Sequence, residues 1–154
     1  MARFASELFT TNFVSGAMSY LDSYPGQEET SRIVLPLLLE GQLTIQAVLD
    51  TGAPWCVLDP EIAEIVTTPE VARYTPQERL LIRGVRYDGQ LYRMGFHLIA
   101  EFGNSLEIDA TVFVPTLRYG EIWSHPNFVG LDGFLNRIRF AIDPDDNSFY
   151  FGVT

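Results

Sequence analysis

An aspartate stands at the end of an apolar strand pattern and leads directly into a Thr-Gly turn, in the stretch Val48-Leu49-Asp50-Thr51-Gly52-Ala53. Apolar residues at alternate positions before it predict a β-strand with one buried face. Such a strand carries the carboxyl group of Asp50 into poorly hydrated surroundings, where its ionised form is unfavourable unless a partner compensates it. Gly52 allows the backbone to turn sharply and to approach a ligand closely. Because the motif occurs once, position 50 is the predicted place for acid–base chemistry.

Size and charge restrict what the chain can be and bind. Its 154 residues are 47% hydrophobic and 19% charged, which is typical of one globular domain. Twenty acidic residues against ten basic ones give a net charge of -10, which argues against nucleic acid or an anionic membrane as a partner. A cationic patch around Arg83, Arg86 and Arg93 would be small.

The cysteine content and the N-terminal composition predict the cellular location. Cys56 is the single cysteine, so no intrachain disulfide can form and a reducing compartment is the simpler assumption. Polar residues interrupt the first twenty positions, which therefore lack the continuous apolar core of a signal peptide. We expect a cytoplasmic protein with no membrane contact, no cofactor and no metal ion.

Strand patterns dominate from residue 32 onward. Residues 1–30 are predicted to be an N-terminal extension and linker, and residues 31–154 the folded domain. Strands are predicted at 33–39 and 43–49, in a hairpin at 79–101 with Gly84 and Gly89 on either side of its tip, at 106–114, at 138–142 and at 148–153. Asp59-Pro60-Glu61 predicts a helix start, and residues 131–137 a short helical turn. This pattern predicts an all-β barrel with one or two short helices.

Three of these elements together resemble the retropepsin-like aspartic proteases. They are the hairpin that ends in Asp50-Thr51-Gly52-Ala53, the glycine-flanked hairpin at 79–101 where that family has its flap, and Val129-Gly130-Leu131-Asp132-Gly133-Phe134-Leu135 followed by the closing strand Arg139-Phe140-Ala141-Ile142-Asp143. The resemblance covers about residues 32–152 and implies a closed acid-protease barrel with a flap hairpin. It also implies an aspartic endopeptidase that hydrolyses peptide or protein substrates.

Such a site needs two carboxylates that share one proton, one to activate water and the other to polarise the scissile carbonyl. The other aspartates of the chain have simpler structural interpretations in caps, strands and turns. The resemblance therefore implies that the second carboxylate is Asp50 of another copy, so that the protein is a homodimer. The strand at 148–153 would join the two protomers.

Further site residues follow from the same resemblance. Asp50 would be catalytic and Thr51 and Gly52 would support the dyad; substrate would meet Gly52, Ala53, Trp55, Gly84, Val85 and Arg86; Gly130 and Asp132 would form a structural motif behind the loop. Pro54, Cys56 and Leu131 depart from the pattern of the viral members, which predicts a different subsite specificity.

Two alternatives remain open at this point. A non-catalytic dimeric module that binds peptide in the same groove is favoured by Cys56, where the family often has Ser or Thr, since a thiol is a weaker hydrogen-bond partner than a hydroxyl. The intact Asp50-Thr51-Gly52 sequence favours the enzyme. A pure oligomerisation domain would explain the last strand but not the glycine-flanked hairpin. Cys56 itself is interpreted as a small core residue.

Overall fold

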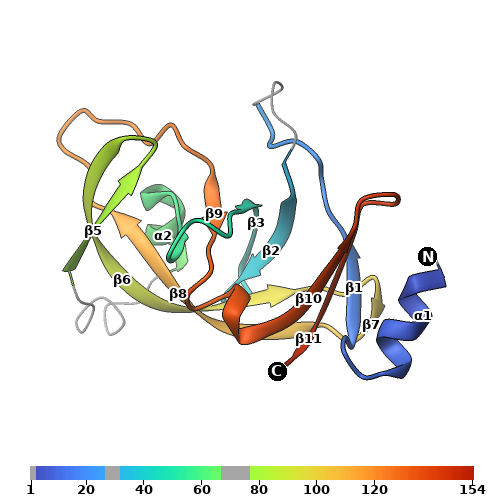
Figure 1. Ribbon diagram of the computed structural model, residues 1–154. Coiled ribbons are helices and arrows are strands. Elements are labelled where there is room, and N and C mark those ends of the chain that lie inside the picture. The colour runs from blue at the N-terminus through green and yellow to red at the C-terminus, as the bar shows by residue number, and fades with distance from the viewer. Residues whose placement is uncertain (1–2, 27–31, 67–76) are drawn as a thin grey trace.

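The computed structural model describes residues 3–26, 32–66 and 77–154, and strands make up most of it (Figure 1). In chain order the elements are α1 (Arg3–Thr10), β1 (Gly16–Ser19), β2 (Val34–Leu39), β3 (Leu43–Leu49), β4 (Cys56–Val57), α2 (Pro60–Val66), β5 (Gln77–Ile82), β6 (Val85–Leu98), β7 (Phe102–Gly103), β8 (Leu106–Pro115), β9 (Asn127–Val129), η1 (Leu135–Arg137), β10 (Ile138–Asp143) and β11 (Ser148–Val153).

The larger sheet closes into a barrel. Its strand order is β2-β3-β9-β4-β8-β6-β5, and β2 pairs in addition with β6 through Leu38↔His97 and Leu39↔Phe96. This pairing joins six strands into a ring and leaves β5 outside it. The predicted all-β barrel is confirmed.

Alternating side chains fill the barrel, as strands with one buried face require. Leu35, Leu37 and Leu39 of β2 point inward, and Met94 and Phe96 of β6 join them in one buried cluster. Because the side chains of a strand alternate between its faces, this inward set fixes the register of both strands. The barrel is therefore a packed core that supports the loops at its ends.

A smaller sheet, of order β10-β11-β1-β7, lies beside the barrel (Figure 1). β1 pairs antiparallel with β11 from Gly16↔Phe151 to Ser19↔Ser148, and Val14, Ala17 and Met18 are buried. The residues that we expected to form an extension thus contribute a strand to this sheet. Residues 27–31, within the predicted linker, lie outside the described residues, and the domain boundary near residue 30 stays a prediction.

The last strand does not have the role that we expected. β11 lies between β10 and β1 and is paired along both of its edges within one chain. The expectation that it joins two protomers is therefore wrong, since its backbone groups already have partners. The sequence pattern of 148–153 identifies a strand but does not specify its neighbours, and β1 is too short for its alternation to be recognised.

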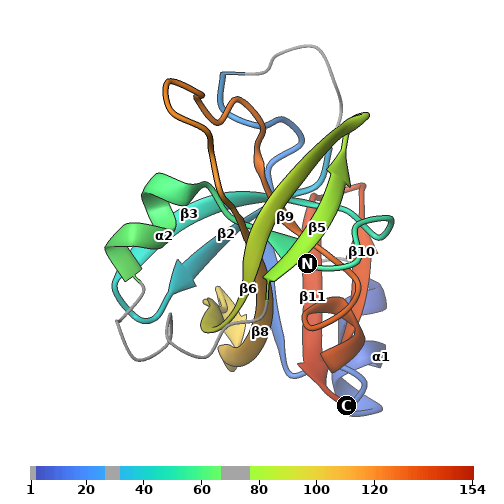
Figure 2. The same ribbon diagram turned by 90° about the vertical axis from the view of Figure 1, so that its left-hand side faces the viewer.

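The predicted second hairpin is present as β5 and β6, which run side by side at the front of the molecule in Figure 2. Its turn consists of Arg83 and Gly84, both with positive φ (49° and 82°), as in the two-residue turns that match strand twist. Gly89 does not flank the tip. It pairs with Glu78 inside the hairpin, where a Cβ would lie 2.4 Å from the carbonyl oxygen of Val114. A glycine is therefore required at position 89 by close packing and not by a turn.

The two α-helices lie apart in Figure 1: α1 is at the right-hand end beside the smaller sheet, and α2 is to the left of β3. The predicted helix is confirmed as α2, where the Glu61 N–H donates to Asp59 Oδ1 at 2.9 Å, as in an N-cap. α1 was not predicted; its Leu8 and Phe9 pack against Tyr150 of the smaller sheet. None of the helices in the described parts of the chain is long and apolar enough to cross a membrane.

Candidate active site

Asp50 lies at the end of β3, where two strands hold its backbone. β3 runs parallel to β9 with Leu49 opposite Val129, and the Asp50 N–H donates to the Val129 carbonyl at 2.9 Å. The chain then turns, with the Ala53 N–H donating to the Asp50 carbonyl at 3.1 Å. The Gly52 N–H donates to Asp50 Oδ1 at 2.9 Å, which fixes the direction of the half-buried carboxyl group.

The loop at residues 50–54, here called the active-site loop, is supported from behind by residues 130–132. The Leu131 N–H donates to the Ala53 carbonyl at 2.8 Å, and the Asp132 N–H donates to the Pro54 carbonyl at 2.7 Å. Gly130 packs so closely that a Cβ there would lie 2.2 Å from the Trp55 carbonyl oxygen. Only glycine leaves room for this contact, so the loop is held by backbone groups on both sides.

The carboxyl group of Asp50 faces a cleft of about 350 Å³, here called the Asp50 cleft. The active-site loop forms one wall and residues 80–83 of the β5–β6 hairpin form another, with Phe128 of β9 also lining it. Most of the remaining lining is apolar, and Asp50 is the acidic residue among the described lining residues. Loop and hairpin together therefore enclose a groove that suits an extended, partly apolar ligand.

The structure brings only some of the predicted site residues together. Gly52 and Ala53 line the Asp50 cleft, and Thr51 is exposed beside them. Trp55 is half-buried, and its ring stacks on Phe113 at a centroid distance of 6.3 Å. Asp132 accepts a hydrogen bond from Asn136 Nδ2 at 3.3 Å.

Gly84 occupies the hairpin turn, with no heavy atom within 4 Å of where its Cβ would be. Val85 and Arg86 line a different hollow, of about 590 Å³, against residues 116–121. The positions of Leu80, Arg83 and Phe128 on the lining of the Asp50 cleft were not predicted from the sequence. The apolar run before Gly84 was a usable signal for the hairpin wall, whereas Phe128 reaches the cleft through the parallel pairing of β3 and β9, which has no local sequence signature.

Asn127 is a second residue that the sequence did not reveal. It is buried, and its Oδ1 accepts the Asp59 N–H at 2.8 Å while its Nδ2 donates to the Gln46 carbonyl at 3.1 Å. It thus links β9, β3 and the start of α2, next to Phe128 of the cleft lining. A buried amide whose oxygen and NH2 group both have hydrogen-bond partners fixes one arrangement of the backbone around it.

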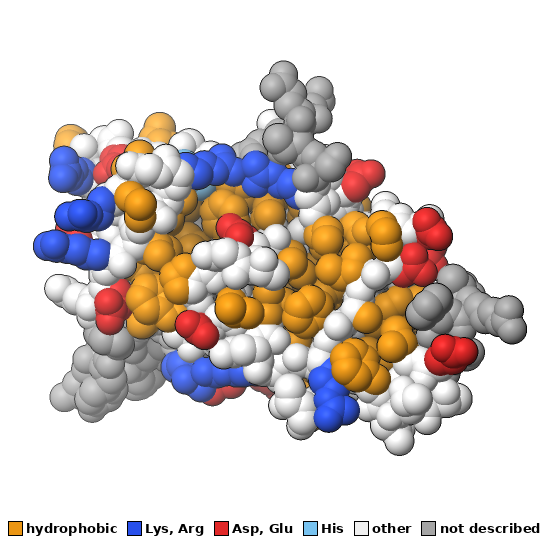
Figure 3. All heavy atoms as spheres, in the orientation of Figure 1, with side chains coloured by type: hydrophobic (Ala, Val, Ile, Leu, Met, Phe, Trp, Pro, Cys, Tyr) orange, Lys and Arg blue, Asp and Glu red, His pale blue; other side chains and the backbone are white. Residues whose placement is uncertain are grey.

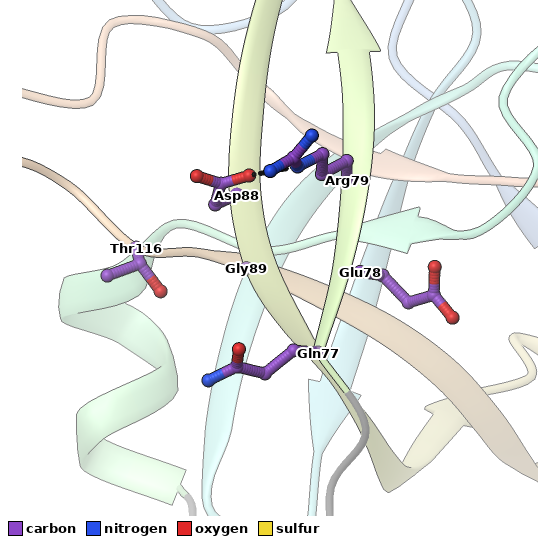
Figure 4. A pocket seen from close by; sticks show the side chains of 6 residues that line it. All are labelled: Gln77, Glu78, Arg79, Asp88, Gly89 and Thr116. Carbon is purple, nitrogen blue, oxygen red and sulfur yellow. Dashed lines mark hydrogen bonds and ion pairs between the residues drawn. The ribbon is translucent and has the colours of Figure 1, made fainter.

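Another hollow, of about 540 Å³, lies along the lower part of the β5–β6 hairpin (Figure 4). There Arg79 Nε and Asp88 Oδ1 approach to 2.9 Å across the two strands, and the hollow is also lined by Gln77, Glu78, Gly89 and Thr116. The two paired charges neutralise each other on an exposed surface, which leaves Glu78 as a single carboxylate on the lining. Within the described ranges no group of three or more His, Cys, Asp and Glu side chains could hold a metal ion.

Cys56 lies under the active-site loop and is completely buried. Burial raises the pKa of its thiol to about 12, although a backbone hydrogen bond from Gly130 acts in the opposite direction. A thiol with this pKa is protonated at neutral pH and is a poor nucleophile. The interpretation of Cys56 as a small core residue agrees with this environment.

Thiol labelling checks this pKa. In the folded protein Cys56 should not react with a thiol reagent between pH 7 and 9 on a time scale of minutes, and should react within seconds in denaturant. Absorbance of the released chromophore measures both rates. Rapid labelling of the folded protein at pH 7 would contradict the buried, protonated thiol.

Comparisons with known proteins bear on the fold. No protein-family model matches the chain, and a search of curated proteins finds no match. The structure is similar to the crystal structure of a retropepsin-like aspartic protease from Rickettsia conorii, with a TM-score of 0.54 over 90% of this chain and 93% of that chain. The chain has a retropepsin-like fold. At 14% sequence identity this likeness shows the fold alone. The β5–β6 hairpin, here called the flap, is the hairpin that the sequence resemblance placed at the position of that family's flap.

Proposed function

We propose that the protein is an aspartic endopeptidase, in which a water molecule is activated between Asp50 and Asp50 of a second protomer. The observation that carries this proposal is the position of Asp50, whose carboxyl group faces a cleft between a rigid Thr-Gly loop and the flap of a retropepsin-like fold. The site is a carboxylate in a largely apolar groove, which suits acid–base chemistry on a bound peptide.

The need for a second protomer follows from the surroundings of the other aspartates. Asp59 caps α2, Asp88 pairs with Arg79, and Asp109 pairs with Arg93 at 2.7 Å. Within the described residues, none of these carboxylates lines the Asp50 cleft. Thr51 and Gly52 of the active-site loop and the neighbouring Leu131 are exposed in the single chain, where a two-fold related copy would have access to them.

The chemistry divides between the two carboxyl groups. Two carboxylates about 3 Å apart share one proton, so the ionised one removes a proton from water while the protonated one polarises the peptide carbonyl. Gly52 donates its backbone N–H to Asp50 Oδ1 of the same chain. The rest of its backbone would contact the backbone of the substrate. Thr51 would hydrogen-bond across the two-fold axis, and Ala53 would line a subsite. The flap would close over the bound chain and exclude water.

A dimeric module that binds peptide without cleaving it is the second candidate. Cys56 favours it, because its buried thiol stands where a hydroxyl would give the active-site loop a stronger hydrogen bond. Both candidates use the same groove and the same partner copy, and they differ only in turnover.

Incubation with an unstructured protein between pH 3 and 7, followed by mass spectrometry of the fragments, separates the two candidates. The enzyme should produce internal fragments that are absent when Asp50→Asn replaces the wild type. Equal cleavage by both proteins would contradict the aspartic-protease mechanism, and cleavage by neither would support the binding module.

Association should tighten on the acid side of neutrality. Each protomer carries a net charge of -10, so two protomers repel each other at pH 7, and protonation of surface carboxylates relieves this repulsion. Sedimentation velocity at pH 7 and pH 4.5, at equal ionic strength, should show a larger dimer fraction at pH 4.5, with cleavage rising in parallel. A monomer at both pH values with undiminished cleavage would contradict the dimer.

A further inference from the structure

Arg83 occupies the turn of the flap and lies on the wall of the Asp50 cleft. Its guanidinium carbon lies 6.0 Å from the centroid of the Phe128 ring, within the range of a cation–π contact. Phe128 is 8% exposed and is fixed by the pairing of β9 with both β3 and β4. A buried ring therefore orients the cationic group at the edge of the cleft.

Arg83 forms no ion pair with a carboxylate of the described residues, although Asp50 lines the same cleft. On the same hairpin Arg79 pairs with Asp88, and Arg93 pairs with Asp109. All ten basic residues of the chain are arginines and acidic residues outnumber them two to one, so an unpaired arginine is not explained by a shortage of acids. A guanidinium group offers a planar set of donors that matches a carboxylate.

The surroundings of Arg83 make this charge effective. The nearby cleft lining from Val48, Leu80 and Ile82 is apolar, and Arg32 is a second arginine on the lining. Figure 3 shows Arg side chains over the flap and along the upper border of a broad hydrophobic surface. The charge of Arg83 also acts on a neighbouring side chain: burial lowers the pKa of His125, and the positive charge of Arg83 lowers it further. An ion pair formed beside apolar walls is screened less than one in open water.

We propose that Arg83 is a specificity-determining residue that recognises a carboxylate side chain, Asp or Glu, on a peptide whose neighbouring apolar residues occupy the Asp50 cleft. This inference rests on the proposed function for its site, and it names the substrate class of that site: apolar sequences that carry an acidic residue close to the cleaved bond. Phe128 holds the guanidinium group in place before the ligand arrives, which reduces the entropy lost on binding.

Binding to the catalytically disabled full chain tests the proposal without turnover. Asp50→Asn protein is titrated against short fluorescein-labelled peptides with a Leu-Phe centre, in which one Glu is placed at each flanking position in turn. Matched peptides carry Gln there, and fluorescence anisotropy gives Kd at pH 6.5 and low salt. We expect one position where Glu binds about tenfold more tightly than Gln, the effect of one charge-assisted pair. Equal binding of the Glu and Gln series, or no binding by the Glu series, would overturn the proposal.

Variants of the same protein identify the arginine that is responsible. Arg83→Gln should lower the ratio of the Kd values of the Gln and Glu peptides from about ten to about one. Arg139→Gln is the matched control, because Arg139 also lies over a phenylalanine ring, that of Phe13 at 5.7 Å, but on β10 and not on the cleft lining. An unchanged preference for Glu in Arg83→Gln would overturn the assignment. Circular dichroism and Tm establish that both variants are folded.

The two proposals fail in different ways. Asp50-dependent cleavage of the peptides without any preference for Glu over Gln would overturn the role of Arg83 and leave the aspartic-protease function in place. A preference for Glu that Arg83→Gln removes, with no Asp50-dependent cleavage, would do the reverse and support a binding module for acidic peptides.

Discussion

Asp50→Asn should lower the rate of peptide cleavage by about a thousandfold or more, because an amide neither accepts the proton of the attacking water nor donates one to the leaving amine. The substitution keeps the size of the side chain. In the wild type the Gly52 N–H donates to Asp50 Oδ1 at 2.9 Å, and the Oδ1 of asparagine can accept the same hydrogen bond. The fold should therefore stay intact, with Tm close to that of the wild type. Fragment release from an unstructured protein, measured at the most active pH, gives the rate.

Asp146→Asn is the matched control for this loss. It makes the same chemical change at an exposed residue of the turn between β10 and β11, away from the Asp50 cleft. Its cleavage rate should equal that of the wild type. An Asp50→Asn protein that retains even a tenth of the wild-type rate would show that another group performs the chemistry.

Gly130→Ala should strongly lower the stability of the fold at the active-site loop. A Cβ at this position would lie 2.2 Å from the Trp55 carbonyl oxygen and 2.8 Å from that of Ala53, so the active-site loop has to move away from β9. Because rigid backbone lines the contact, we expect a loss of about 3 kcal/mol in the free energy of unfolding. Urea denaturation monitored by tryptophan fluorescence measures it.

Gly120→Ala separates this clash from the general cost of replacing a glycine. Gly120 has a φ of 79° with no heavy atom within 4 Å of its ideal Cβ, so alanine there meets backbone strain alone, of about 1 kcal/mol. An equal loss in both variants would contradict the close packing behind the active-site loop. Any folded Gly130→Ala protein should also have a much lower cleavage rate, because the loop that positions Asp50 is displaced.

The parts of the fold that were predictable are those with a local physical signature. Alternation of apolar residues predicted both hairpins and the strand of β8, and the order Asp59-Pro60-Glu61 predicted α2. The pairing partners of β11 were not predictable, because its pattern is the same for a strand that joins two chains and for one enclosed within a single chain. α1 was missed because its packing against Tyr150 depends on residues at the other end of the chain.

The same distinction, between features with a local sequence signature and features that depend on distant pairing, applies to the residues of the candidate site. Asp50, Gly52 and Ala53 are neighbours in sequence, and the structure places Gly52 and Ala53 beside Asp50 in the cleft. Phe128 comes to the cleft through a parallel strand pair, and Arg83 through the length of the flap, so their proximity depends on the register of distant strands. Gly89 was misplaced for a related reason, since a glycine required by close packing has the same sequence signature as one required by a turn.

Subunit mixing tests most directly whether one active site needs two copies of Asp50. Wild-type and Asp50→Asn chains are unfolded together in equal amounts, refolded at a fixed total concentration, and assayed for cleavage. If both aspartates of a dimer are required, only pairs of wild-type chains act, and activity should fall to about one quarter of that of an all-wild-type sample. Activity of about one half would show that each chain works alone, and would contradict the shared site.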